Sequence, residues 1–118
     1  MEYSLVKHAG LEFRGIAAAG IHGVGWKKLP KNIASLVRGF FDSRRILKDF
    51  KPEVLFFTGG YIGIPMAFAG IHIPQLIFIP DIEPGLSLKV LARLADTIAV
   101  VCDDSKKYLP SHKKIMVT

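Results

Sequence analysis

The chain has 118 residues, of which 50% are hydrophobic, and a mean hydropathy of +0.33. These values exclude a disordered chain, and the length allows one domain with a core rather than two. Sixteen Lys and Arg against ten Asp and Glu leave a net charge of +6, which favours an anionic partner such as phosphate, anionic lipid or nucleic acid.

The first half of the chain predicts a short helix, a strand, a loop and a long helix. Residues 2–9 are expected to form a helix that ends at Gly10, and residues 11–17 a strand. Residues 20–29 are rich in glycine and predict a loop. Pro30 then begins a helix that reaches Phe50, because proline is tolerated in a first helical turn. Most of its apolar stripe is expected to pack in the core: Ile33, Leu36, Val37, Phe40, Leu47 and Phe50.

The middle of the chain is apolar enough to raise the question of a membrane span. No Asp, Glu, Lys or Arg occurs from Val54 to Pro80. A spanning helix would have to contain Gly59-Gly60 and several prolines, which weaken or break its hydrogen bonds. Residues 54–57 and 76–79 are instead typical of parallel strands, which are buried on both faces and therefore lack polar alternation.

Strand-like and helix-like segments alternate to the end of the chain. The expected order is helix 61–69, strand 75–79, loop 80–85, helix 86–95, strand 97–101, helical turn 105–109 and strand 114–117. Such alternation with short connections is typical of βαβ units and right-handed crossovers. We therefore predict one α/β domain over residues 1–118, with a Rossmann-like parallel sheet that has helices on both faces.

Ligands of such sheets bind beyond the carboxyl ends of the strands. There, the Gly59-Gly60 pair either lets the backbone approach a phosphate or only makes a tight turn. Asp81, in a loop stiffened by proline, either serves as a base or sugar-binding carboxylate or only shapes the loop. Asp103 and Asp104 are expected to cap the next helical turn. The scattered histidines and single Cys102 predict no metal site, no disulfide and no cofactor.

A mixed apolar and basic stretch precedes and enters the long helix. Trp26 and Phe41 accompany Lys27, Lys28 and Lys31, a combination that suits the interface of an anionic membrane. The alternative is an ordinary amphipathic helix whose charges face water. Aromatic side chains are sparse among the other basic residues, so we predict no binding of nucleic acid.

Several motifs, in order along nearly the whole chain, resemble the N-terminal domain of the MurG family. They are residues 1–11, residues 43–54 (SRRILKDFKPEV), residues 58–65 (TGGYIGIP, similar to the family's GGYxxxP loop), Ile73-Pro74, residues 84–86 (PGL) and residues 91–96 (LARLAD). Members of that family are GT-B glycosyltransferases that add N-acetylglucosamine to lipid-linked muramyl-pentapeptide in peptidoglycan synthesis.

The chain also departs from the family pattern. The family's first βα unit with its GGTGGHxxP loop would precede Met1, and the donor-binding domain would follow Thr118. Phe78-Ile79-Pro80-Asp81 stands where the family has His-Glu-Gln-Asn, and Gly63 replaces a serine. The resemblance thus implies an incomplete, acceptor-side N-terminal domain for which we assign no catalytic residue, and a related lipid-linked glycosyltransferase stays possible.

The resemblance also implies partners and sites. Gly59, Gly60 and Tyr61 would bind the diphosphate of a lipid-linked sugar acceptor, and Asp81 would lie near the sugar. The region from Trp26 to Phe41, with its lysines, would face the inner surface of the cytoplasmic membrane, which makes the protein cytoplasmic and peripheral.

The resemblance leaves two functions open. The first is part of a glycosyltransferase that is inactive without its donor-binding domain or subunit. The second is a non-catalytic subunit of a split enzyme that binds the acceptor or recruits it to the membrane. In either case the missing first strand would expose apolar surface, which predicts self-association or association with a missing piece.

Overall fold

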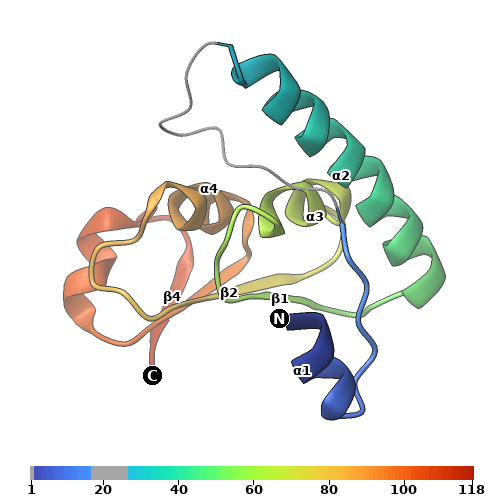
Figure 1. The fold of residues 1–118 in the computed structure, drawn as a ribbon. Coiled ribbons are helices and arrows are strands. Elements are labelled where there is room, and N and C mark those ends of the chain that lie inside the picture. Colours follow the sequence, from blue (N-terminus) through green and yellow to red (C-terminus); the bar gives the residue numbers. More distant parts are fainter. Residues whose placement is uncertain (1, 17–26) are drawn as a thin grey trace.

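The computed structural model describes residues 2–16 and 27–118, and these contain one parallel β-sheet. The strand order is β1-β2-β3-β4, with each strand parallel to its neighbour. The strands are β1 (Leu55–Phe57), β2 (Gln75–Ile79), β3 (Thr97–Val100) and β4 (Lys114–Val117). The predicted α/β class with a parallel sheet is confirmed, whereas the described crossover helices lie on one face of the sheet rather than on both faces as predicted (Figure 1).

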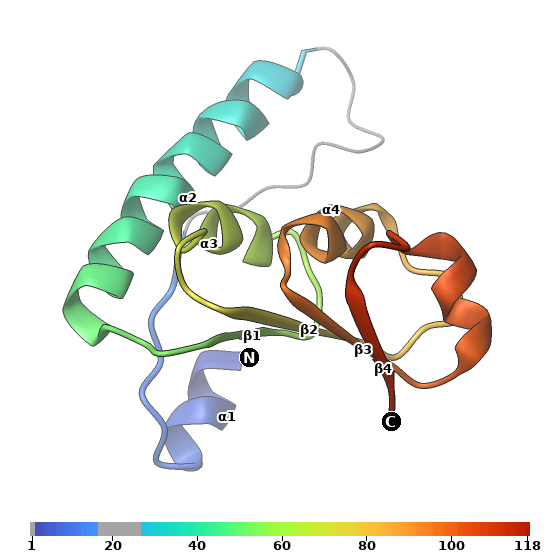
Figure 2. The ribbon, with the colours of Figure 1, turned by 180° about the vertical axis from the view of Figure 1, so that it is seen from behind.

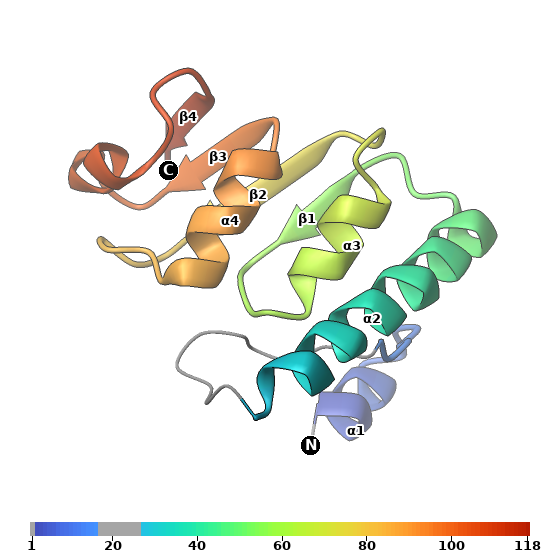
Figure 3. The same cartoon turned by 90° about the horizontal axis from the view of Figure 1, so that it is seen from above.

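Two crossover helices cover one face of this sheet (Figures 1 and 2). They are α3 (Gly63–Ala69), which follows β1, and α4 (Leu86–Leu94), which follows β2. Right-handed crossovers that always step to the next strand on the same side place their helices on the same face. The 3-10 helix η1 (Asp103–Tyr108) connects β3 to β4. The first helix, α1 (Glu2–His8), lies off the β1 side of the sheet, at the level of the opposite face (Figures 1 and 3).

The core lies between the sheet and the two crossover helices. Side chains in register on neighbouring strands point to this side, as in the pair Ile77 and Ile98, both fully buried. From the helices, Ala67 and Leu91 pack against them. Burying one aliphatic side chain stabilises a fold by about 1.5–3 kcal/mol. This buried layer therefore keeps the strands, and the strand ends from which the loops begin, in fixed positions.

The long helix α2 (Leu29–Phe50) packs against α3 rather than directly on the sheet (Figure 3). Its buried residues are Gly39 and Ser43, one turn apart, and the Ser43 hydroxyl donates to the Gly39 carbonyl over 2.7 Å. Small residues at this spacing let a second helix approach closely. The expectation that most of the apolar stripe is core is therefore wrong. Because α2 is one layer removed from the sheet, Ile33 and Val37 stay 48% and 51% exposed.

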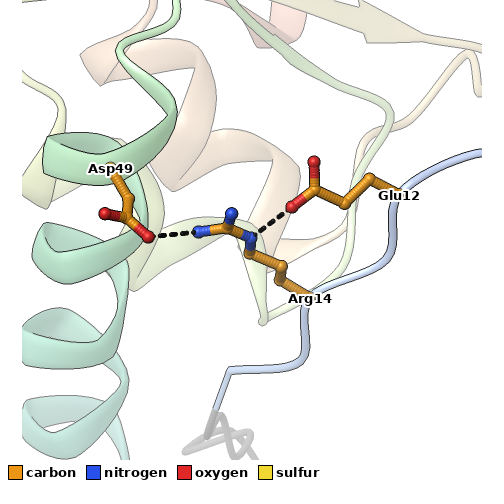
Figure 4. A network of polar contacts seen from close by, with 3 residues as sticks. All are labelled: Glu12, Arg14 and Asp49. Carbon is orange, nitrogen blue, oxygen red and sulfur yellow. Dashed lines mark hydrogen bonds and ion pairs between the residues drawn. The ribbon is translucent and has the colours of Figure 1, made fainter.

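Residues 11–16 do not form the predicted strand, and Ala17 lies outside the described residues. An extended segment becomes a strand only when its backbone pairs with a neighbour, and residues 11–16 join no ladder of this sheet. Instead Arg14 bonds to Glu12 over 2.6 Å and to Asp49 of α2 over 3.1 Å (Figure 4). The hydrogen bonds to Glu12 and then to Asp49 raise the pKa of Arg14.

Candidate functional site

The loop after β1 contains the glycine pair, and its backbone requires glycine. Gly59 has a φ of 127° and Gly60 a φ of 82°, both values that side chains of L-residues rarely adopt. The turn then closes into α3, with the Gly63 amide donating to the Gly60 carbonyl and the Ile64 amide to the Tyr61 carbonyl. The predicted tight strand-to-helix turn is thus present at the carboxyl edge of the sheet.

The glycine loop lies directly on the helix that follows β2. A Cβ atom on Gly59 would lie 3.3 Å from Leu88 of α4, and one on Gly63 would lie 3.2 Å from Leu91 and from Phe57. This crowding favours glycine at position 63, where the family pattern has a serine. The loop is therefore supported from below by the core, while Gly60 is exposed on the surface.

The loop after β2 is fastened to the turn after β3. The fully buried Ser105 donates its hydroxyl to the Asp81 carbonyl over 3.3 Å and lies 3.5 Å from the Cys102 sulfur. The Asp81 carboxylate is exposed and has no hydrogen-bond or ion-pair partner among the described residues. Sequence reasoning missed Ser105, and the available signal was a small polar residue in the short helical turn that follows a buried strand.

The capping role expected for Asp103 and Asp104 is wrong. Cys102, not an aspartate, occupies the N-cap position of η1 and makes no side-chain cap. Asp103 lies one residue inside the helix, where its side chain turns to Lys106 in an i,i+3 ion pair. In the described ranges, 2–16 and 27–118, no three His, Cys, Asp or Glu side chains gather as a metal site would require.

The basic residues predicted to face a membrane lie at the start of α2. Lys27, Lys28 and Lys31 are exposed there, whereas Trp26 and the loop histidine His22 fall outside the described residues. Phe41 is 59% exposed, but ten residues of helix place it about 15 Å further along the axis than Lys31. The structure thus puts Phe41 and the lysines on one helix without bringing them together.

Two clefts between α2 and the α3 region add further residues to the surface that was predicted to face a membrane. One, of about 310 Å³, is lined entirely by apolar or proline side chains: Leu36, Val37, Phe40, Ile64, Pro65 and Phe68. The other, of about 590 Å³, is lined by Phe41 and by the basic residues Arg44, Arg45, Lys48 and His72 among others. Arg44, Arg45 and Lys48 follow Phe41 within two turns of α2, and this clustering of basic residues was the signal in the sequence.

The orientation of α2 relates these surfaces to the sheet edges. A helix that leads into a strand runs antiparallel to it, so α2 begins at the carboxyl edge and ends at the amino edge (Figure 3). Lys27, Lys28 and Lys31 therefore lie toward the end of the molecule that carries the glycine loop. No helix in the described part of the chain has the length and apolar content needed to cross a bilayer.

Comparison with known proteins shows where this arrangement recurs. The model of the glycosyltransferase family 28 N-terminal domain matches residues 1–100. The chain is 33% identical over 118 residues to the UDP-N-acetylglucosamine–N-acetylmuramyl-(pentapeptide) pyrophosphoryl-undecaprenol N-acetylglucosamine transferase of Geobacter metallireducens, covering 98% of this chain and 32% of the relative. It is 36% identical over 120 residues to the transferase of the same name from Caldanaerobacter subterraneus, covering 100% and 33%.

A solved structure shows the same fold. The crystal structure of Acinetobacter baumannii MurG matches with a TM-score of 0.79 at 23% identity, over 100% of this chain and 34% of that one. The chain therefore spans about a third of the length of the relatives it matches. These matches confirm the family resemblance predicted from the motifs.

Proposed function

Because the chain belongs to the family of glycosyltransferase family 28 N-terminal domains, we propose that its carboxyl-edge loops bind the acceptor of a glycosyl transfer. The acceptor is a sugar on a lipid-linked diphosphate, and the transferred group is N-acetylglucosamine or a related sugar from a nucleotide sugar. The names of the relatives support this choice of chemistry in cell-wall synthesis. The proposal rests on one observation: the glycine loop and the exposed lysines lie toward the same end of the molecule.

The glycine loop is the proposed diphosphate site. Without side chains, Gly59 and Gly60 leave their backbone accessible to a bulky anion, and Tyr61 offers a half-buried ring and hydroxyl beside them. The positive φ values fix the direction of the peptide groups, so the loop needs little rearrangement on binding. Asp81, fastened through its carbonyl at the same edge, is the proposed contact for sugar hydroxyls.

The start of α2 is the proposed membrane contact. A lipid-linked diphosphate lies at the membrane surface, so a protein that binds it must bring its phosphate site to the headgroups. Lys27, Lys28 and Lys31 supply positive charge at that end, each worth about 1 kcal/mol near an anionic surface. Trp26, Phe41 and the apolar cleft lined by Phe40 and Phe68 would enter the interface. The proposed location is the cytoplasmic face of the cell membrane.

Transfer requires a donor-binding partner, either a second domain or a separate subunit. This part of the proposal rests on the match to an N-terminal domain and on coverage of a third of each relative. In the alternative, the chain is a non-catalytic subunit that binds or recruits the acceptor. Nucleotide sugar added to the 118-residue chain alone should give neither tight binding nor transfer, and tight binding would contradict both versions.

Binding of an isoprenyl diphosphate in detergent micelles tests the phosphate site. We expect the wild-type chain to bind the diphosphate more tightly than the same alcohol without phosphate. The side chain of Gly60→Val meets little but open space, but its backbone is strained at φ 82°, so circular dichroism first establishes that the variant is folded. The folded variant should bind at least about tenfold more weakly. Gly15→Val, at an exposed glycine beside Arg14 and away from the carboxyl edge, is the control and should bind normally. Equal binding by both variants would rule out the glycine loop.

Vesicle sedimentation tests the membrane contact. The triple variant Lys27→Ala, Lys28→Ala, Lys31→Ala should lose binding to vesicles that contain anionic lipid, and salt should weaken wild-type binding. A charge-matched control removes three lysines near η1: Lys106, Lys107 and Lys113. If both variants lose binding equally, net charge rather than this surface attracts the protein to lipid.

A further inference from the structure

The loop between β2 and α4, residues 80–85, presents the exposed Asp81 carboxylate at the carboxyl edge of the sheet. The loop forms no helix or strand of its own, so its backbone can be fixed only by contacts with neighbouring elements. This matters for binding, because a carboxylate on a fixed backbone recognises a ligand without the entropic cost of ordering a loop.

The helix η1 holds the start of this loop through one buried side chain. Ser105 is fully buried, and its hydroxyl donates to the Asp81 carbonyl over 3.3 Å. The Ser105 oxygen also lies 3.5 Å from the Cys102 sulfur, and because the serine proton goes to Asp81, the thiol is the donor in that pair. Ser105 therefore connects the turn after β3 to the backbone that carries the Asp81 carboxylate.

The end of the loop is held as well. Pro84 is fully buried, and the Lys89 nitrogen of α4 lies 5.8 Å from the centre of the Tyr108 ring, at the end of η1. Leu109 follows η1 directly and packs in the core, which anchors the helix itself. Since Tyr108 is exposed and Ser105 is fully buried, the serine bond is the contact of η1 that should respond most strongly to substitution.

We propose that Ser105 is a positioning residue for the sugar of the acceptor, because it fixes the backbone from which Asp81 reaches the sugar hydroxyls. This inference rests on the proposed function, in which Asp81 contacts the sugar. Removing the hydroxyl would take this hydrogen-bond partner from the Asp81 carbonyl and let the residue turn. The glycine loop rests on Leu88 of α4 instead, so the diphosphate site should not depend on Ser105.

Two probes in detergent micelles separate these contributions. One is an isoprenyl diphosphate that carries an N-acetylmuramyl group, the sugar in the relatives' names, and the other is the same isoprenyl diphosphate without a sugar. The wild-type chain should bind the sugar-bearing probe more tightly. Ser105→Ala should reduce this preference at least about fivefold and leave the affinity for the bare diphosphate unchanged.

Ser43→Ala is the matched control. Ser43 is also fully buried, and its hydroxyl also donates to a backbone carbonyl, that of Gly39, but within α2. The control therefore loses the same kind of hydrogen bond without touching the loop, and it should keep the wild-type preference for the sugar. Circular dichroism establishes that each variant is folded. Ser105→Cys, with a side chain of similar size and a weaker donor, should give a smaller loss under reducing conditions and replaces Ser105→Ala if that variant does not fold.

Combining Ser105→Ala with Asp81→Ala tests whether the serine acts through the carboxylate. Asp81→Ala alone should remove most of the preference for the sugar, and adding Ser105→Ala should then change it no further. A role of Ser105 in stability alone would not depend on the Asp81 side chain, so its effect on binding would be the same in both backgrounds.

Several results would overturn the proposal. Equal losses of preference in Ser105→Ala and Ser43→Ala would attribute the effect to lower stability, and additive effects of Ser105→Ala and Asp81→Ala would show that the serine does not act through Asp81. A wild-type chain that binds both diphosphates equally would remove the sugar contact itself. A wild-type chain that binds neither diphosphate more tightly than the free alcohol would refute the proposed function, and this inference with it.

Discussion

Replacing the two loop glycines by alanine should destabilise the protein to different and predictable extents. At φ 82°, an alanine in place of Gly60 costs about 1–2 kcal/mol of backbone strain and meets no crowded atom. At φ 127°, Gly59→Ala costs about 1–3 kcal/mol in strain, and its new methyl group also presses on Leu88 at 3.3 Å. Alanine restricts the unfolded chain and returns about 0.4–1 kcal/mol in each case.

The net free energy of unfolding should therefore fall by about 1 kcal/mol for Gly60→Ala and about 2 kcal/mol for Gly59→Ala. Gly85→Ala is the control, because its φ is −65° and no atom lies within 4 Å of the new methyl group. Its unfolding free energy should not fall, and the restricted unfolded chain should raise it by up to about 0.4–1 kcal/mol. Urea unfolding followed by far-ultraviolet circular dichroism measures all three. If Gly59→Ala is as stable as Gly85→Ala, the positive φ values do not constrain the loop.

Three further substitutions test other parts of the fold. Gln75→Leu removes two buried hydrogen bonds from its amide to carbonyls at the end of α3, at 2.8 and 3.0 Å, and urea unfolding should show a loss of about 1–3 kcal/mol. Gly70→Ala would place a methyl group 2.5 Å from Leu55, and calorimetry should show a lower melting temperature, equivalent to about 1–3 kcal/mol. Asp49→Ala breaks only an exposed ion pair with Arg14, so the urea midpoint should stay unchanged. Because the hydrogen bonds to Glu12 and Asp49 raise the pKa of Arg14 further into the alkaline range, Arg14 stays charged at neutral pH, and the Asp49→Ala comparison should give the same result from pH 6 to pH 9.

Local sequence patterns were sufficient to predict most elements of this fold. Apolar runs such as residues 76–79 predicted β2, and the helix predicted from Pro30 to Phe50 matches α2 to within one residue. The failure at residues 11–16 has a different origin. The alternation at Leu11 and Phe13 suits a β-strand. A strand also needs a neighbouring strand whose backbone pairs with it, and that pairing depends on residues far apart in the sequence.

The candidate site could be predicted only in part. The glycine pair signalled a tight turn, and the structure adds the positive φ values and the support from Leu88. The connection from Ser105 to Asp81 spans 24 positions and is invisible to local reasoning. Likewise, the periodicity of α2 predicted an apolar stripe without revealing that another helix separates it from the sheet.

The narrow contact of α2 through Gly39 and Ser43 has a consequence for the dynamics of the chain. The fully buried residues of this 22-residue helix are two small ones, and its apolar side chains, such as Leu47, are at most half-buried. It therefore has less apolar burial to oppose its detachment than β2 and β3, which are held by fully buried Ile77 and Ile98. The amide protons of α2 should therefore exchange with solvent through local opening, at rates well above those of the central strands. The molecule would thus have two levels of stability, with a persistent sheet and a helix that can detach and refold on its own timescale.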